Sequence, residues 1–102
     1  MTTDPTPALL SQQGKTAFER GQYDEAADLF RRAAQGLGQA DAAEMNNNLS
    51  VALLQAGKAR EALEAALGTD QVFAQAGDRR RQGMALGNQA AALEALGRTD
   101  EA

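Results

Sequence analysis

The sequence predicts an all-α protein built from consecutive helical hairpins, and two observations support that prediction. A glycine followed four residues later by Glu-Ala occurs three times, each time after a stretch with helical periodicity. Alanine is the most frequent residue, whereas only three Phe and one Tyr are present. That composition is typical of close-packed helices rather than of a β-sandwich or barrel. With 102 residues, the chain is expected to form one domain.

The repeated pattern extends upstream of each glycine. Gly21, Gly57 and Gly97 lie 36 and 40 residues apart. Four positions before these glycines stand Ala17, Leu53 and Leu93, and seven positions before them stand Gly14, Ser50 and Ala90. Nine positions before them stand Gln12, Asn48 and Asn88, and eleven positions before them stand Leu10, Asn46 and Leu86. Spacings of three and four place residues on one helical face. Because glycine adopts the left-handed backbone that ends a helix, each copy predicts a helix, a turn and a second helix.

The first three helices are predicted from their starts and their apolar faces. Thr6-Pro7 is a favourable start for a helix over residues 7–20. A second helix is expected over 24–35. The pattern Asp41…Glu44 has the form of a capping box and predicts a third helix over 41–56. The apolar stripe of the second helix consists of Ala26, Ala27, Leu29, Phe30 and Ala33.

Two longer helices and the start of a sixth are predicted after Gly57. The fourth is expected over 59–76, weakened at Gly68 and Thr69 by about 1 kcal/mol for the glycine. The fifth is expected to follow the stop at Gly77, with Asp78 as its cap, and to end near Leu96. A truncated sixth helix is expected to begin near residues 98–100. The apolar stripe of the fourth consists of Ala62, Ala66, Thr69, Phe73 and Ala76.

Three segments in phase carry a resemblance to a known family. They are Leu10…Gly14…Ala17-Phe18…Gly21-Gln22-Tyr23-Asp24-Glu25-Ala26…Phe30…Ala33, then Asn48-Leu49…Leu53…Gly57…Glu61-Ala62-Leu63, then Asn88…Leu93…Gly97…Glu101-Ala102. Together they resemble the tetratricopeptide repeat (TPR). The resemblance implies a right-handed α-α superhelix, with repeats at about 7–40, 43–78 and an incomplete 83–102, after a flexible N-terminus at 1–6. Ala59 and Thr99 replace the Tyr of the first copy, and Asn46 replaces a bulky residue, so helix lengths are expected to differ from the family's.

In a TPR stack the first helix of each pair lines a concave groove, and the resemblance therefore implies a binding surface for a protein or peptide. Amides both donate and accept hydrogen bonds, which suits a bound peptide backbone. For Asn48 and Asn88 the alternative is that they only satisfy neighbouring helix backbone or water. Phe18, Val51 and Leu54 are the expected apolar anchors. The implied groove residues are Gln12, Lys15, Glu19, Asn47, Asn48, Gln55, Asn88 and Glu94.

Some family members bind a C-terminal carboxylate through Lys, Asn and Arg at fixed places. Asn48 matches one such place, but Ser11, Lys15, Met84 and Asn88 stand at the others. Binding of chaperone C-termini is therefore not predicted.

The last predicted helix leaves an apolar face without a partner. Met84, Leu86, Leu93 and Leu96 would face the missing helix. We expect either that the natural protein continues past Ala102 with more repeats, or that a second copy covers this face and forms a homo-oligomer. The run Arg79-Arg80-Arg81 is either a docking site for an acidic segment or a solvated group of charges.

Composition excludes several classes of function. The chain has no Cys and no His, so disulfides, thiol chemistry and His- or Cys-ligated metals are ruled out. A net charge of −4 disfavours nucleic-acid binding. No apolar run is long enough to span a membrane, and the N-terminus does not resemble a signal peptide, so a cytoplasmic location is expected. No cofactor is expected.

Acidic clusters such as Asp24, Glu25 and Asp28, or Glu61 and Glu64, recur with the repeat near helix starts, where acids suit the helix dipole. The pattern therefore favours a non-catalytic protein-interaction scaffold over an enzyme. The alternatives are a self-assembly module that uses the end face and a sensor domain of a larger regulator.

Overall fold

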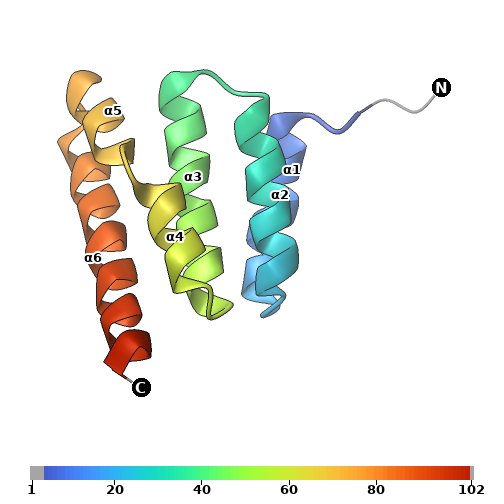
Figure 1. Cartoon of the computed structure of the whole chain (residues 1–102). Helices are drawn as coiled ribbons and strands as arrows, with labels where there is room; N and C mark the ends of the chain where they lie inside the picture. The colour runs from blue at the N-terminus through green and yellow to red at the C-terminus, as the bar shows by residue number, and fades with distance from the viewer. Residues whose placement is uncertain (1–3, 102) are drawn as a thin grey trace.

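The chain folds into a row of helices. The computed structural model describes the backbone of residues 4–101 and the side chains of residues 4–98. Within that range every regular element is a helix, which confirms the all-α class. The helices are α1 (Pro7–Glu19), α2 (Tyr23–Gln35), α3 (Gln39–Gln55), α4 (Ala59–Ala66), α5 (Thr69–Gln75) and α6 (Arg79–Glu101). They pack largely in chain order, with α1 and α2 at one end and α6 at the other (Figure 1). The molecule measures 51 × 32 × 18 Å.

The first hairpin forms as the sequence predicts. The Thr6 hydroxyl accepts a hydrogen bond from the Leu9 amide at 3.2 Å, and Pro7 opens the helix. Gly21 turns the chain with φ of 75°, and all five residues of the predicted stripe on α2 are buried. The ring of Phe30 packs against Gly14 so closely that an added Cβ there would lie 2.8 Å from its Cε1 atom. The small residue at position 14 is thus required by the aromatic on α2.

The third helix begins earlier than predicted. It starts at Gln39 after Gly38 in extended backbone, so Asp41 lies inside the first turn and the predicted capping box does not form. The Asp41 carboxylate still suits a helix N-terminus through the dipole. Inside the helix, the buried Ser50 hydroxyl donates to the Ala62 carbonyl of α4 at 2.7 Å. This bond ties α3 to the next helix.

The prediction of one helix over 59–76 is wrong, because the chain breaks between α4 and α5. Leu67 is extended (φ −61°, ψ 129°) and Gly68 is left-handed (φ 85°). The Thr69 hydroxyl contacts the Ala66 carbonyl at 2.7 Å and the Asn47 side-chain oxygen at 2.9 Å, so it satisfies backbone that a continuous helix would have bonded itself. The predicted stripe is still buried, except for the exposed Ala76.

The last helix is longer than predicted. Asp78 caps it as expected, since its carboxylate accepts from the Arg81 amide at 3.0 Å. The helix then continues through Gly97 to Glu101, so the predicted end near Leu96 and the separate sixth helix are wrong. A glycine inside a helix costs only about 1 kcal/mol and ends it only where the chain adopts a turn. An i,i+4 ion pair between Glu94 and Arg98 supports the helix here.

Two apolar clusters hold the row together. The larger one joins α1 to α4 and includes Phe30, Leu49 and Leu53, with Ala92 of α6 at its edge. The smaller cluster joins α3, α5 and α6 through Ala43, Phe73 and Ala85. The second cluster exists because the break at Gly68 redirects α5, which brings Phe73 against both long helices.

Candidate functional site

A cavity of about 230 Å³ opens between α1, α2 and α3. Three of the predicted groove residues line it, as do two of the three predicted anchors; Leu54 is half-buried and packs against the main core instead. Its lining consists of Lys15, Phe18 and Glu19 from α1, Phe30 from α2, and Asn48 and Val51 from α3. We call this the α1–α3 cavity.

The walls of the α1–α3 cavity combine an apolar floor with a charged rim. Phe30 is buried and the Phe18 ring is held edge-on against Tyr23, with centroids 5.2 Å apart and planes at 65°. Lys15 and Glu19 are exposed and stand one helical turn apart on α1. Their opposite charges cancel at the rim, so the cavity suits an apolar side chain flanked by polar backbone.

A second, smaller cavity of about 130 Å³ lies where α3, α5 and α6 meet. Asn48 lines this cavity as well as the first, so the two adjoin on either side of one amide side chain. We call the second one the α3–α6 cavity. Its lining consists of Glu44, Asn47 and Asn48 from α3, Phe73 from α5, and Arg80, Arg81 and Met84 from α6.

Of the two arginines that line the α3–α6 cavity, only Arg81 forms ion pairs among the described side chains. Arg81 pairs with Glu44 at 3.4 Å and with Asp78 at 3.5 Å, and its guanidinium lies 6.0 Å from the centre of the Phe73 ring. Arg80 lines the cavity and is exposed. The sequence shows the arginine run but does not indicate that it borders a cavity. The signal that was missing is the helix break that brings Phe73 to this corner.

Asn47, a predicted groove residue, serves the fold as well. It is only 6% exposed, and its side-chain oxygen accepts from the Thr69 hydroxyl. A buried carbonyl oxygen without that donor would cost free energy, so this amide primarily fixes the α4–α5 break.

The remaining predicted groove residues do not join the two cavities. Gln55 is exposed and Asn88 is half-buried, and neither lines the cavities described here. Glu94 is exposed and pairs with Arg98. Gln12 lies elsewhere, in a cavity of about 470 Å³ on the open side of α1 and α2. The repeat aligns Gln12 with Asn48, but Asn48 faces the preceding hairpin, and in the described chain no hairpin precedes α1.

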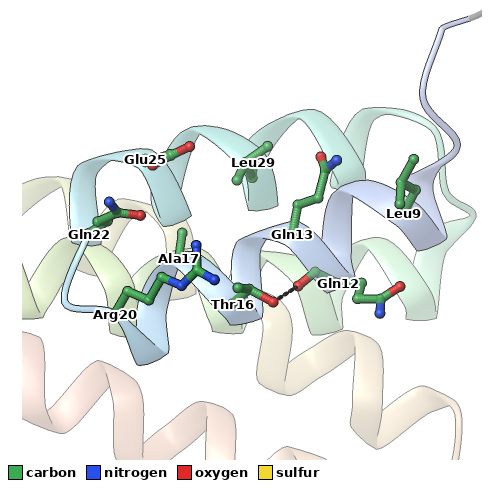
Figure 2. A pocket seen from close by; sticks show the side chains of 9 residues that line it. All are labelled: Leu9, Gln12, Gln13, Thr16, Ala17, Arg20, Gln22, Glu25 and Leu29. Atoms are coloured by element: carbon green, nitrogen blue, oxygen red, sulfur yellow. Dashed lines mark hydrogen bonds between the residues drawn. The ribbon is translucent and has the colours of Figure 1, made fainter.

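The open-side cavity has a larger volume than the α1–α3 and α3–α6 cavities, yet its walls suit a ligand less well. Figure 2 shows Glu25 and Leu29 on α2 along one side, with Thr16 on α1 and Arg20 directly after it along the other. Long polar side chains and the exposed Leu9 line it, whereas Leu29 and Ala17 are only 8% and 4% exposed and offer little buried apolar floor. Binding anchors are usually buried apolar pockets ringed by polar groups. The α1–α3 cavity has that arrangement and the open side does not.

The acidic clusters noted in the sequence lie outside the groove. Asp24 pairs with Lys58 at 3.0 Å, and the hydrogen bond from Lys58 to Asp24 raises the pKa of that lysine above 10.5. Asp28 lies 3.9 Å from Arg32, while Glu61 and Glu64 line a separate cavity beside Arg31. These carboxylates sit among cations on the surface formed by α2, α3 and α4.

The predicted end face is largely exposed, as the sequence suggested. Met84, Leu86 and Leu93 are 55%, 47% and 56% exposed, whereas Leu96 is half-buried. Met84 belongs to the α3–α6 cavity. Leu86 and Leu93 stand two helical turns apart on α6. Leu67, in the α4–α5 break, is a further exposed apolar residue at 59%.

Comparisons with known proteins add no relative. No protein-family model, curated protein or solved structure gives a significant match to this chain. None of the helices in the described part combines the length and apolar character of a membrane span. The functional argument therefore rests on the repeat pattern and on the geometry of the two adjoining cavities.

Proposed function

We propose that this chain is a non-catalytic protein-interaction module of TPR type, which binds a peptide segment along α1, α3 and α6. One observation carries the proposal. The TPR resemblance implies Lys15, Glu19 and Asn48 as groove residues, and these three line one cavity together with the expected anchors Phe18 and Val51. The stacking of hairpins in chain order supports the right-handed superhelix that the resemblance implies.

The size of the α1–α3 cavity favours a peptide over a small molecule. Small-molecule sites usually enclose roughly 300–1,000 Å³. A cavity of about 230 Å³ is smaller, and it suits a single large side chain of a peptide. Asn48 beside it can donate to and accept from the backbone of the same segment.

A displayed library of random peptides, selected on the whole chain, tests the proposal. A selected peptide is then titrated against Asn48→Ala and Val51→Arg, with Asn46→Ala as a control of the same residue type on the same helix. We expect Asn48→Ala to weaken binding about tenfold, the effect of one hydrogen bond of about 1.4 kcal/mol. Val51→Arg should fill the cavity and abolish binding. Circular dichroism must show that each variant remains helical.

The proposal fails if Asn48→Ala and Asn46→Ala bind equally well and Val51→Arg also retains the peptide. That outcome would move the binding surface away from the α1–α3 cavity. A selection that yields no peptide above background would have the same meaning.

Self-assembly is a second candidate, because Leu86 and Leu93 are exposed on one side of α6. Contiguous exposed apolar residues commonly mark contact surfaces. Sedimentation equilibrium across a range of concentrations tests it, with Leu93→Glu compared to Ala74→Glu, an exposed site on α5. Assembly through the end face predicts a mass that rises with concentration and falls only in Leu93→Glu. A constant monomer mass in the unmodified chain would remove this candidate.

A further inference from the structure

We propose that the α3–α6 cavity is a carboxylate pocket, in which Arg80 binds an acidic side chain of the same peptide whose apolar side chain fills the α1–α3 cavity. The inference rests on the proposed peptide-binding function and specifies its partner. The partner is a segment with an acidic residue close to a large apolar one. Arg80 is not among the positions that the TPR resemblance assigns to carboxylate binding.

Arg80 is the available cation in this corner. Arg81, its neighbour in sequence, is already held by Glu44 and Asp78 and lies over Phe73. Among the described side chains, no ion pair involves Arg80, which nevertheless lines the cavity. A guanidinium presents a planar fork of donors that matches a carboxylate with two parallel hydrogen bonds. An incoming carboxylate would complete that pairing.

The surrounding charge sets the orientation of the ligand. The whole chain carries a net charge of −4, so an acidic segment is repelled over most of the surface. Arg79, Arg80 and Arg81 stand together at the start of α6, and the ion pairs of this run among the described side chains are those of Arg81 with Glu44 and Asp78, which leaves a local positive balance. At the other cavity Lys15 and Glu19 cancel. The acidic end of a peptide is therefore directed to α6 and its apolar residue to α1.

Asn48 connects the two cavities and sets the spacing of the ligand. Because its side chain lines both, it stands beside the peptide backbone that runs between the two bound side chains. In an extended peptide, alternate side chains on one face are about 7 Å apart. Because one residue, Asn48, borders both cavities, we assign the two bound side chains to that spacing. The motif is then an acid and a bulky apolar residue with one residue between them.

Two displayed libraries test this motif. Both fix a Leu and, one residue away on either side, a Glu in the first library or a Gln in the second, with random flanking positions. We expect the unmodified chain to enrich the Glu library at least tenfold over the Gln library. Arg80→Glu should remove that preference. Arg79→Glu changes the net charge equally one residue away, but Arg79 is exposed and does not line the cavity, so this variant should reduce the preference much less.

A charge exchange sharpens the test. A Lys in place of the fixed Glu should restore binding to Arg80→Glu and abolish binding to the unmodified chain. Glu44→Gln should strengthen binding of the Glu peptides two- to fivefold, because it removes the anion that competes for this cavity.

Equal enrichment of the two libraries would overturn the inference, and so would equal losses in Arg79→Glu and Arg80→Glu. The proposed function stands apart from these outcomes. If peptides from either library lose affinity in Asn48→Ala but not in Arg80→Glu, the groove binds peptides and only the carboxylate pocket is wrong. If neither library binds above a scrambled control, the groove itself is wrong.

Discussion

The two hairpins share one turn motif but fill their cores differently. In the first, the Phe30 ring packs against Gly14. Thirty-six residues later the same two places hold Ala66 and Ser50, and the serine hydroxyl bonds to the Ala62 carbonyl. The first hairpin thus packs a large side chain against a glycine, whereas the second packs two small residues together and adds a hydrogen bond. The two hairpins therefore keep the turn motif while the residues packed between their helices differ.

The two hairpins also differ in the shape of the helix that follows the turn. In the second hairpin this helix breaks directly after Ala66, whereas α2 continues unbroken to Gln35. Beyond the break, Phe73 becomes the buried aromatic and packs against Ala43 and Ala85. The corner it forms is the α3–α6 cavity. The break that makes the second hairpin irregular is therefore the feature that places Phe73 beside Arg80 and Arg81 in this cavity.

The largest expected effect comes from removing the aromatic of the first hairpin. Phe30 is 2% exposed and contacts the core of α1 to α3. Phe30→Ala should lower the free energy of unfolding by about 3–5 kcal/mol, through lost burial and an unfilled cavity. Urea unfolding followed by circular dichroism measures it. A loss below about 1 kcal/mol would mean that the hairpin does not depend on this ring.

At Gly14, which packs against Phe30 from α1, added rather than lost side-chain volume should lower the stability. Gly14→Ala adds a Cβ at 2.8 Å from Phe30, and overpacking of this kind costs about 1–3 kcal/mol. Ser50→Ala at the equivalent place should cost about 1 kcal/mol, through its lost hydrogen bond. The cost of Gly14→Ala should shrink in a Phe30→Leu background. Additive costs in that double-mutant cycle would contradict direct contact between the two positions.

The break between α4 and α5 should be sensitive at its glycine. Gly68 has φ of 85°, where a side chain costs about 1–2 kcal/mol. Gly68→Ala should lower stability by that amount. Gly97→Ala, inside α6, should instead be neutral or stabilising, since a helical glycine is unfavourable there. Paired urea titrations compare them, and destabilisation by both would show that Gly97 also requires a turn.

The smallest effect is expected at the ion pair that links the two hairpins. Lys58 and Asp24 join the starts of α4 and α2, and both are exposed, so Lys58→Gln should change the melting temperature only slightly. The pKa of Lys58 is raised above 10.5 by its hydrogen bond with Asp24. Its contribution is therefore present below pH 10.5 and is lost as the pH rises through that raised pKa. Melting curves should differ at neutral pH and converge in strong alkali. A difference that persists there would exclude the ion pair as its cause.

Local signals made the first hairpin predictable and long-range contacts made the second less so. Thr6-Pro7, Gly21 and the stripe of α2 are read within a few residues of each element. At the α4–α5 break the sequence shows a weak point at Gly68, but the Thr69 hydroxyl there also bonds to Asn47, 22 residues away. A window as short as one helix does not contain both partners. At Gly97 the local signal gives the wrong prediction, because the glycine motif that follows α1 and α3 lies inside α6.

The proposed groove likewise includes residues that the sequence could indicate and residues that only long-range contacts bring to it. Lys15, Glu19 and Asn48 could be expected to share one face because the TPR resemblance assigns all three to the groove, and they do line one cavity. Gln12 has the same phase as Asn48, but a shared wall needs a preceding hairpin, and α1 has none in the described chain. Arg80 was visible as a charge but not as part of a cavity, because only the position of α5 brings Phe73 beside it.

The central claim is that the two adjoining cavities form one working surface, and chemical-shift mapping tests it most directly. The isotope-labelled chain is titrated with a selected peptide, and amide and side-chain shifts are followed. The account predicts the largest changes at Phe18, Asn48 and Val51 and at Arg80 and Met84, with little change at Leu93 or Arg20. Changes centred on Leu86 and Leu93, or on the open side around Gln12 and Arg20, would contradict it.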